Sequence, residues 1–120
     1  MANHNDVGKL GEQIAQKHLK AKNYRILDSN WRWGKGEIDL IAQDKGVLIF
    51  VEVKTRKKAT FGTPEEAVTN KKQQLMYELA TEYMYNIQHE AEFRFDIIAI
   101  ILEPQLEIRH FEDAFFPDWS

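Results

Sequence analysis

The feature that most constrains the fold is a pair of runs with strand-like alternation, joined by a short polar turn. The runs are Gly36–Ile41 and Phe50–Lys54, and Asp44-Lys45-Gly46 lies between them. Both runs alternate with the two-residue period of a β-strand. A segment such as Asp-Lys-Gly is typical of a tight turn. The sequence therefore predicts a β-hairpin.

The register of this hairpin decides where its charged residues point. A two-residue tip, Lys45-Gly46, pairs Asp44 with Val47, Ala42 with Ile49, Leu40 with Val51, Asp39 with Glu52, and Glu37 with Lys54. One face then contains only aliphatic residues: Ile38, Leu40, Ala42, Val47, Ile49, Val51 and Val53. The other face carries Glu37, Asp39, Glu52 and Lys54 beside Ile41, Leu48 and Phe50. A three-residue tip would mix charge into the aliphatic face, so we expect an even register, with Asp39 and Glu52 opposite or diagonal on one face.

Two carboxylates are thus expected side by side on a partly buried surface. Directly opposed Cβ atoms lie roughly 5 Å apart, and at that distance two carboxylates repel by about 3 kcal/mol at an effective dielectric constant near 20. Lys54 offsets only part of this repulsion, and a divalent cation such as Mg²⁺ or Mn²⁺, which prefers oxygen ligands, would offset the rest. The alternative is an ordinary cross-strand salt bridge on a solvated face. The combination of Asp39, Glu52 and Lys54 favours the metal site.

The residues around the acidic pair resemble a known family. Asp39 is followed, after twelve intervening residues, by Glu52-Val53-Lys54, which resembles the signature of the PD-(D/E)xK nuclease superfamily, although Ile38 and not Pro precedes Asp39. From Gly8 to about Ile100, the chain resembles the bacterial YraN-like family, small nuclease-fold proteins similar to archaeal Holliday junction resolvases. The matching segments are Gly8–Glu12 with Ala15, Asn30–Arg32, Gly36–Ala42, Phe50–Arg56, Phe61-Gly62, Ala67-Val68, Lys71 and Arg94–Asp96.

This resemblance implies a site, an activity and a fold. Asp39 and Glu52 would hold Mg²⁺ or Mn²⁺, with the backbone carbonyl of Val53 as a further ligand. Lys54 would orient the attacking water or stabilise charge on the phosphate, and Glu12 would join the site from the first helix. The implied function is that of a metal-dependent endonuclease acting on structured or branched DNA, and the implied assembly is a homodimer. The implied fold is α/β, a restriction-endonuclease-like core with a mixed, twisted sheet of about five strands and flanking helices.

Several basic residues are candidates for phosphate contacts. The nucleic-acid-binding candidates are Arg32, Arg56 and Lys57, which belong to or flank the hairpin, and Lys71, in the first turn of a predicted helix. For each of them the alternative is solvated surface. The net charge of −3 and the pI of about 5.8 are unlike those of a general nucleic-acid binder. The alternative function is therefore a nucleic-acid-binding or interaction module with a catalytically idle nuclease fold, and RNA stays open as the substrate.

Composition limits the remaining possibilities. A length of 120 residues predicts a single domain, and 43% hydrophobic with 29% charged residues is ordinary for a globular protein. The absence of cysteine excludes disulfides and thiolate metal sites. The chain shows no apolar signal-peptide core and no run long enough for a membrane span, so we expect a cytoplasmic protein. The four histidines lack metal-ligand spacing, and we assign them no chemistry.

The remaining elements follow from periodicity and capping signals. We expect a helix over residues 6–22, a strand over 24–30, a capping box at Thr63–Glu66, a helix over 70–88, and strands over 93–102 and 106–110. Gly8 and Gly11 each cost a helix about 1 kcal/mol relative to Ala. Close approach of the helix backbone to the sheet or to a phosphate would compensate, and a frayed first turn is the alternative for Gly8. The aromatic tail Phe115–Trp119 either folds back on its own domain or meets a second subunit.

Overall fold

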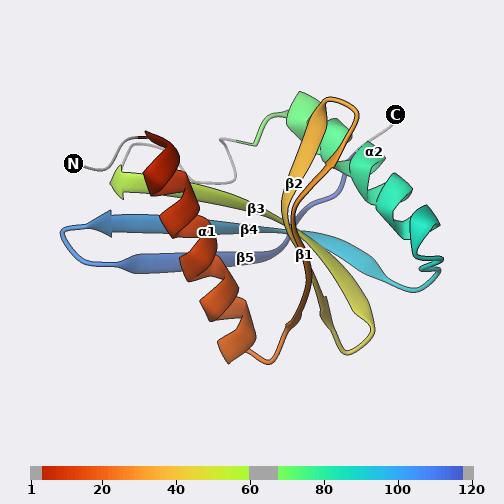
Figure 1. Cartoon of the computed structure of the whole chain (residues 1–120), viewed down its shortest axis with the longest axis horizontal. Coiled ribbons are helices and arrows are strands. Elements are labelled where there is room, and N and C mark those ends of the chain that lie inside the picture. The colour runs from red at the N-terminus through yellow and green to blue at the C-terminus, as the bar shows by residue number, and fades with distance from the viewer. Residues whose placement is uncertain (1–3, 60–67, 118–120) are drawn as a thin grey trace.

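Five strands form one sheet that carries a helix on each face (Figure 1). The computed structural model describes residues 4–59 and 68–117. In chain order the elements are α1 (His4–Ala21), β1 (Arg25–Trp33), β2 (Gly36–Asp44), β3 (Val47–Lys58), α2 (Asn70–Asn86), β4 (Phe93–Glu103) and β5 (Glu107–Phe115). The predicted order of helices and strands is confirmed. The last strand continues five residues beyond its predicted end, and the first strand begins a residue later and extends three residues further than expected.

The sheet is mixed, as predicted. Its strand order is β1-β2-β3-β4-β5, and every neighbouring pair is antiparallel except β3 and β4, which run parallel. A parallel pair needs a crossover connection, and α2 lies within it. β3 is the central strand and is buried through most of its first half. The α/β class and the sheet of five strands are therefore confirmed.

The predicted hairpin forms in the predicted register over part of its length. Leu40 pairs with Val51, Ala42 with Ile49 and Asp44 with Val47. The backbone pairing of β2 with β3 stops at Leu40, so the predicted backbone pairs of Asp39 with Glu52 and of Glu37 with Lys54 are wrong. Beyond this point β2 remains paired with β1 alone, down to the turn between them. β2 and β3 thus separate beside Asp39 and Glu52.

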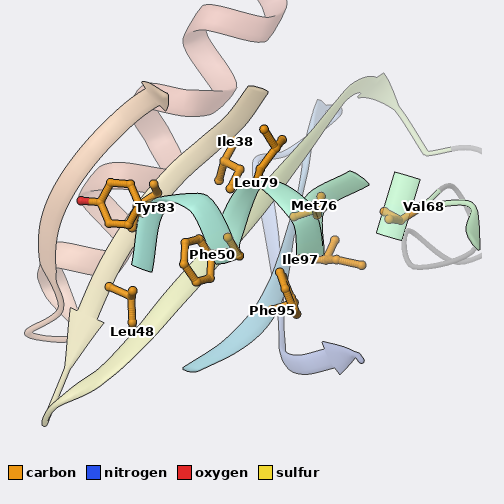
Figure 2. Packing of buried hydrophobic residues seen from close by; sticks show 11 residues of the cluster. Ile38, Leu48, Phe50, Val68, Met76, Leu79, Tyr83, Phe95 and Ile97 are labelled. Carbon is orange, nitrogen blue, oxygen red and sulfur yellow. The ribbon is translucent and has the colours of Figure 1, made fainter. Parts of the chain in front are cut away.

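The core consists of two apolar clusters, one on each side of the sheet. The cluster under α2 includes Phe50, Phe95, Met76 and Leu79 (Figure 2). The cluster under α1 includes these buried residues: Ala15, Leu19, Leu40, Ala42, Ile49, Val51, Ile98 and Ile100. Ile38 corrects the predicted faces, because it packs with Leu79 in the α2 cluster and not with Leu40. The physical reason is that β2 has already left β3 at Ile38 and turns its side chains toward α2.

Two glycines mark places where backbone meets a neighbouring side chain. A Cβ at Gly11 would lie 1.7 Å from the Thr55 Oγ1, so α1 approaches β3 as closely as a glycine allows. A Cβ at Gly36 would lie 2.7 Å from Leu79 Cδ1 at the start of β2. At Gly8 a Cβ would meet nothing within 4 Å. The expected compensation by close packing therefore holds for Gly11 and not for Gly8.

One carboxylate is buried within the sheet, away from the acidic pair. Asp96 is fully buried, and its oxygens lie 3.0 Å from the Arg94 Nε and 2.8 Å from the His110 Nε2. The Asp113 N–H also donates to it, at 3.0 Å. Burial opposes ionisation, but these hydrogen bonds outweigh it and lower the pKa of Asp96. Arg94 and Asp96 thus form an ion pair within the sheet.

The aromatic tail packs on its own domain as far as the structure describes it. Phe115 stacks on Phe95 with ring centroids 5.1 Å apart, and Phe116 lies 5.9 Å from both Tyr77 and Phe93. The predicted capping box at Thr63–Glu66 and the end of the tail lie outside the described residues. Neither helix in the described ranges is long and apolar enough to cross a membrane.

Candidate active site

The site begins where β2 leaves β3. At this point β3 stays paired with β4 on one side but has lost β2 on the other, and the side chain of Asp39 takes the place of β2. The Val53 N–H donates a hydrogen bond of 2.8 Å to the Asp39 Oδ2. A buried backbone N–H needs such an acceptor. This bond fixes the Asp39 carboxyl directly beside the strand that carries Glu52.

The acidic pair predicted from the sequence does come together. The Glu52 side chain lies close enough to Asp39 to oppose its ionisation, and Glu52 is only 6% exposed. Burial and then the charge of Glu52 raise the pKa of Asp39 to about 8, against 3.8 for an ordinary aspartate. Neighbouring carboxylates repel each other, so the fold itself must hold these two side chains close together. The two side chains converge although their backbones do not pair.

The cation that contacts this pair comes from α2. The Lys72 Nζ lies 3.4 Å from the Glu52 Oε2. Lys54, the predicted partner on the strand itself, is half-buried and makes no ion pair or hydrogen bond with any described residue. The site therefore combines two strand carboxyls with one helix ammonium.

A second group of polar side chains adjoins the pair from α1 and β1. The Asn30 Nδ2 donates to the Glu12 Oε1 at 2.9 Å and to the Glu37 Oε1 at 2.7 Å. The charge of Glu12 also contributes to the raised pKa of Asp39, after burial and Glu52. The close packing of Gly11 against Thr55 holds this turn of α1 against β3. Glu12 thus lies next to the acidic pair without touching it.

The donor set fits a hard divalent cation. Carboxylate oxygens are the ligands that Mg²⁺ and Mn²⁺ prefer, and Mg²⁺ is commonly held by one or two carboxylates with waters and substrate phosphate in its other positions. Across residues 4–59 and 68–117, no three His, Asp or Glu side chains are arranged to hold a metal ion together. A cation at Asp39 and Glu52 would therefore take its other ligands from backbone, water or substrate.

The predicted nucleic-acid contacts lie around the site on the surface. Arg32 is 78% exposed and lies 3.7 Å from the Glu37 Oε2. Arg56 donates to the backbone carbonyl of Thr55, at the exposed end of β3. Lys57 and Lys71 are exposed. Among the described residues, a carboxylate contacts Arg32 and none of the other three side chains, and all four lie on the surface where a phosphate can reach them.

Two residues of the site were not singled out from the sequence. Lys72 precedes Met76 by four positions and Leu79 by seven, so it continues the buried stripe of α2. That spacing was available in the sequence and distinguishes Lys72 from the exposed Lys71. Asn30 has a backbone φ of +50°, and its link between Glu12 and Glu37 depends on the pairing of β1 with β2, for which the sequence carries no comparable signal.

Comparison with known proteins places relatives across nearly the whole chain. Residues 11–100 match a family described as "Uncharacterised protein family UPF0102". A UPF0102 protein of Flavobacterium psychrophilum is 46% identical over 117 residues, which cover 97% of this chain and 98% of that protein. A UPF0102 protein of Symbiobacterium thermophilum is 47% identical over 112 residues, covering 91% of this chain and 95% of that protein.

Among solved structures, Pyrococcus furiosus SfsA in complex with Ca²⁺ is similar at 16% identity and a TM-score of 0.33. The match covers 88% of this chain and 62% of that one.

Proposed function

The chain belongs to the uncharacterised protein family UPF0102, and we propose that it is a metal-dependent endonuclease of the PD-(D/E)xK type, hydrolysing phosphodiester bonds in structured or branched DNA. The observation that carries this proposal is the contact between Asp39 and Glu52. The fold holds these two carboxyls together although this raises the pKa of Asp39 to about 8, and a cation between them would relieve the repulsion.

The residues of the site divide the work as follows. Asp39 and Glu52 would hold Mg²⁺ or Mn²⁺, and the Val53 carbonyl is a candidate third ligand, since the N–H and C=O of one strand residue face the same side. The bound ion would supply a water of lowered pKa and positive charge at the phosphoryl oxygens. Lys54 would stabilise negative charge that develops on the phosphate, and Glu12 would orient water at the edge of the site.

The surrounding cations support a phosphate-rich substrate. Arg56 and Lys57 extend from the same strand as Glu52, and Lys71 lies one residue before the site's Lys72. Contacts of this kind supply most of the affinity for nucleic acid. The net charge of −3 argues against tight binding to any duplex and favours a substrate of defined shape.

Cleavage assays test the proposal. Purified protein with Mg²⁺ or Mn²⁺ is incubated with a four-way junction, a flap, single-stranded and duplex DNA, and a structured RNA. We expect cleavage of a branched DNA, lost in Asp39→Asn and Glu52→Gln. Asp44→Asn, an acid at the far end of the same hairpin, is the matched control and should retain activity.

Two outcomes would contradict the proposal. Cleavage that survives both Asp39→Asn and Glu52→Gln would point to a contaminating nuclease. Junction binding without cleavage, unchanged in Asp39→Asn, would identify a binding module instead.

A further inference from the structure

The ion pair between Lys72 of α2 and Glu52 of β3 joins one partly exposed and one buried side chain. Glu52 is nearly buried, with a side chain 7% exposed, whereas the Lys72 side chain remains 35% exposed. The Thr69 Oγ1 accepts a hydrogen bond of 3.2 Å from the Lys72 N–H, which fixes the backbone at the first turn of α2. The base of the Lys72 side chain is therefore fixed while its ammonium end can move.

Lys72 and a bound cation would compete for the same oxygen. The Lys72 Nζ lies 3.4 Å from the Glu52 Oε2, on the carboxylate that a metal ion would use together with Asp39. A divalent cation there would satisfy both carboxyls and repel the ammonium at close range. Binding of the cation thus removes the electrostatic attraction that holds the Lys72 ammonium at Glu52.

An open hollow beside Lys72 can accept its side chain once the ammonium is displaced from Glu52. Beside the site, the first turn of α2 borders an open hollow of about 440 Å³. It is lined by Thr69, Lys71, Lys72, Gln74, Leu75 and Glu78. An ammonium that turns from Glu52 toward this hollow faces solvent beside the proposed metal site. A phosphate of a bound nucleic acid is the natural partner for it there.

We propose that Lys72 is an exchangeable counter-ion, which neutralises Glu52 in the metal-free protein and binds a substrate phosphate once a divalent cation has entered the site. This inference rests on the proposed nuclease function, and it adds a coupling between metal binding and nucleic-acid binding. Toward the metal, Lys72 is a positioning residue, since it affects metal binding only by competing for Glu52.

The first test is the affinity for Mn²⁺ alone, measured by calorimetry. Lys72→Gln removes the competitor, and the affinity of this variant for Mn²⁺ should rise roughly 2- to 5-fold, the upper part of the range for a partly exposed ion pair. Lys72→Arg keeps the charge and should bind Mn²⁺ as the wild type does, and Lys71→Gln is the matched neighbour and should also be unchanged. A tighter metal site is a result that mere damage to α2 would not produce.

The second test is binding of a four-way DNA junction with and without Ca²⁺, at several salt concentrations. Ca²⁺ should strengthen junction binding more in the wild type than in Lys72→Gln. With Ca²⁺ present, the logarithmic salt dependence should be smaller by about one ion in Lys72→Gln, the value for one lost phosphate contact.

The outcomes separate the two proposals. Equal Mn²⁺ affinity in the wild type and Lys72→Gln, or equal salt dependence, overturns the role of Lys72 and leaves the metal site standing. Failure of the wild type and of both Lys72 variants to bind Mn²⁺ overturns the metal site and this inference together.

Discussion

The close approach of α1 to β3 can be tested by adding a single methyl group at Gly11. The new Cβ would lie 1.7 Å from the Thr55 Oγ1, 2.7 Å from its Cβ and 2.8 Å from its Cγ2. Rotation of the Thr55 side chain relieves the contacts with Oγ1 and Cγ2 but not the one with Cβ, which the backbone fixes. Gly11→Ala must therefore push α1 away from β3.

The magnitude follows from two opposing effects. Overpacking of this kind costs about 1–3 kcal/mol, and the gain in helix propensity from Gly to Ala returns about 1 kcal/mol. Gly8→Ala is the matched control, because its Cβ meets nothing within 4 Å and only the gain remains. The two variants should therefore differ in stability by about 1–3 kcal/mol, which for a chain of this size is roughly 4–12 °C in the midpoint of thermal unfolding.

The assay is thermal and urea unfolding of both variants beside the wild type. We expect Gly8→Ala to unfold at the wild-type temperature or above and Gly11→Ala below it. In a Thr55→Gly background, which removes the opposing Cβ, the penalty of Gly11→Ala should disappear. Equal stability of Gly11→Ala and Gly8→Ala would refute the close contact that places α1 and Glu12 against the site.

Three further predictions concern charge and capping. The raised pKa of Asp39 means that the folded protein keeps a proton that the unfolded chain releases near pH 4. The free energy of unfolding of the metal-free protein should therefore fall as pH rises from about 4 toward about 8, by at most about 1.4 kcal/mol per pH unit. Asp39→Asn should remove this pH dependence, as measured by urea unfolding at several pH values. Asp96 has the opposite shift, so its contribution is present above its unfolded pKa and is lost as pH falls below that range. Asp96→Asn should destabilise the protein by about 3 kcal/mol at pH 7, because it leaves Arg94 with a weaker partner, and a loss under 1 kcal/mol would contradict this. Thr69→Ala removes the N-cap of α2 and should lower the free energy of unfolding by about 1 kcal/mol, measured by chemical unfolding. An unchanged free energy of unfolding would contradict a stabilising role of this cap.

The hairpin and its acidic pair were predictable because alternation in a strand carries its own register. Once Leu40 is set opposite Val51, the positions of Asp39 and Glu52 follow within a residue, and the structure confirms that the side chains meet. A one-residue error would have exchanged the two faces of the strand, and the aliphatic residues excluded that error.

The separation of β2 from β3 was not predictable in the same way. It depends on Gly36 and Ile38 packing against Leu79 of α2, a contact between segments far apart in the sequence. No local pattern in β2 distinguishes a strand that stays paired from one that turns toward a helix. The hydrogen bond from Asn30 to Glu12 was not predictable for a similar reason, because it joins residues that no local pattern brings together.

The helical pattern of α2 distinguishes Lys72, which contacts Glu52, from the neighbouring Lys71. Lys71 and Lys72 are chemically identical neighbours, and the first turn of a helix favours both as phosphate contacts. The buried positions Met76 and Leu79 place Lys72 on the inner stripe and leave Lys71 outside it. Burial on a helix, more than charge alone, identifies the residue that reaches Glu52.

The central claim is that the carboxyls of Asp39 and Glu52 form a binding site for a divalent cation. Crystals soaked in Mn²⁺ and measured near the manganese absorption edge test it directly. The account predicts one anomalous peak about 2.1 Å from an oxygen of each carboxylate, with Lys72 turned away from Glu52. A saturating soak that gives no anomalous peak between the carboxyls of Asp39 and Glu52 would contradict it.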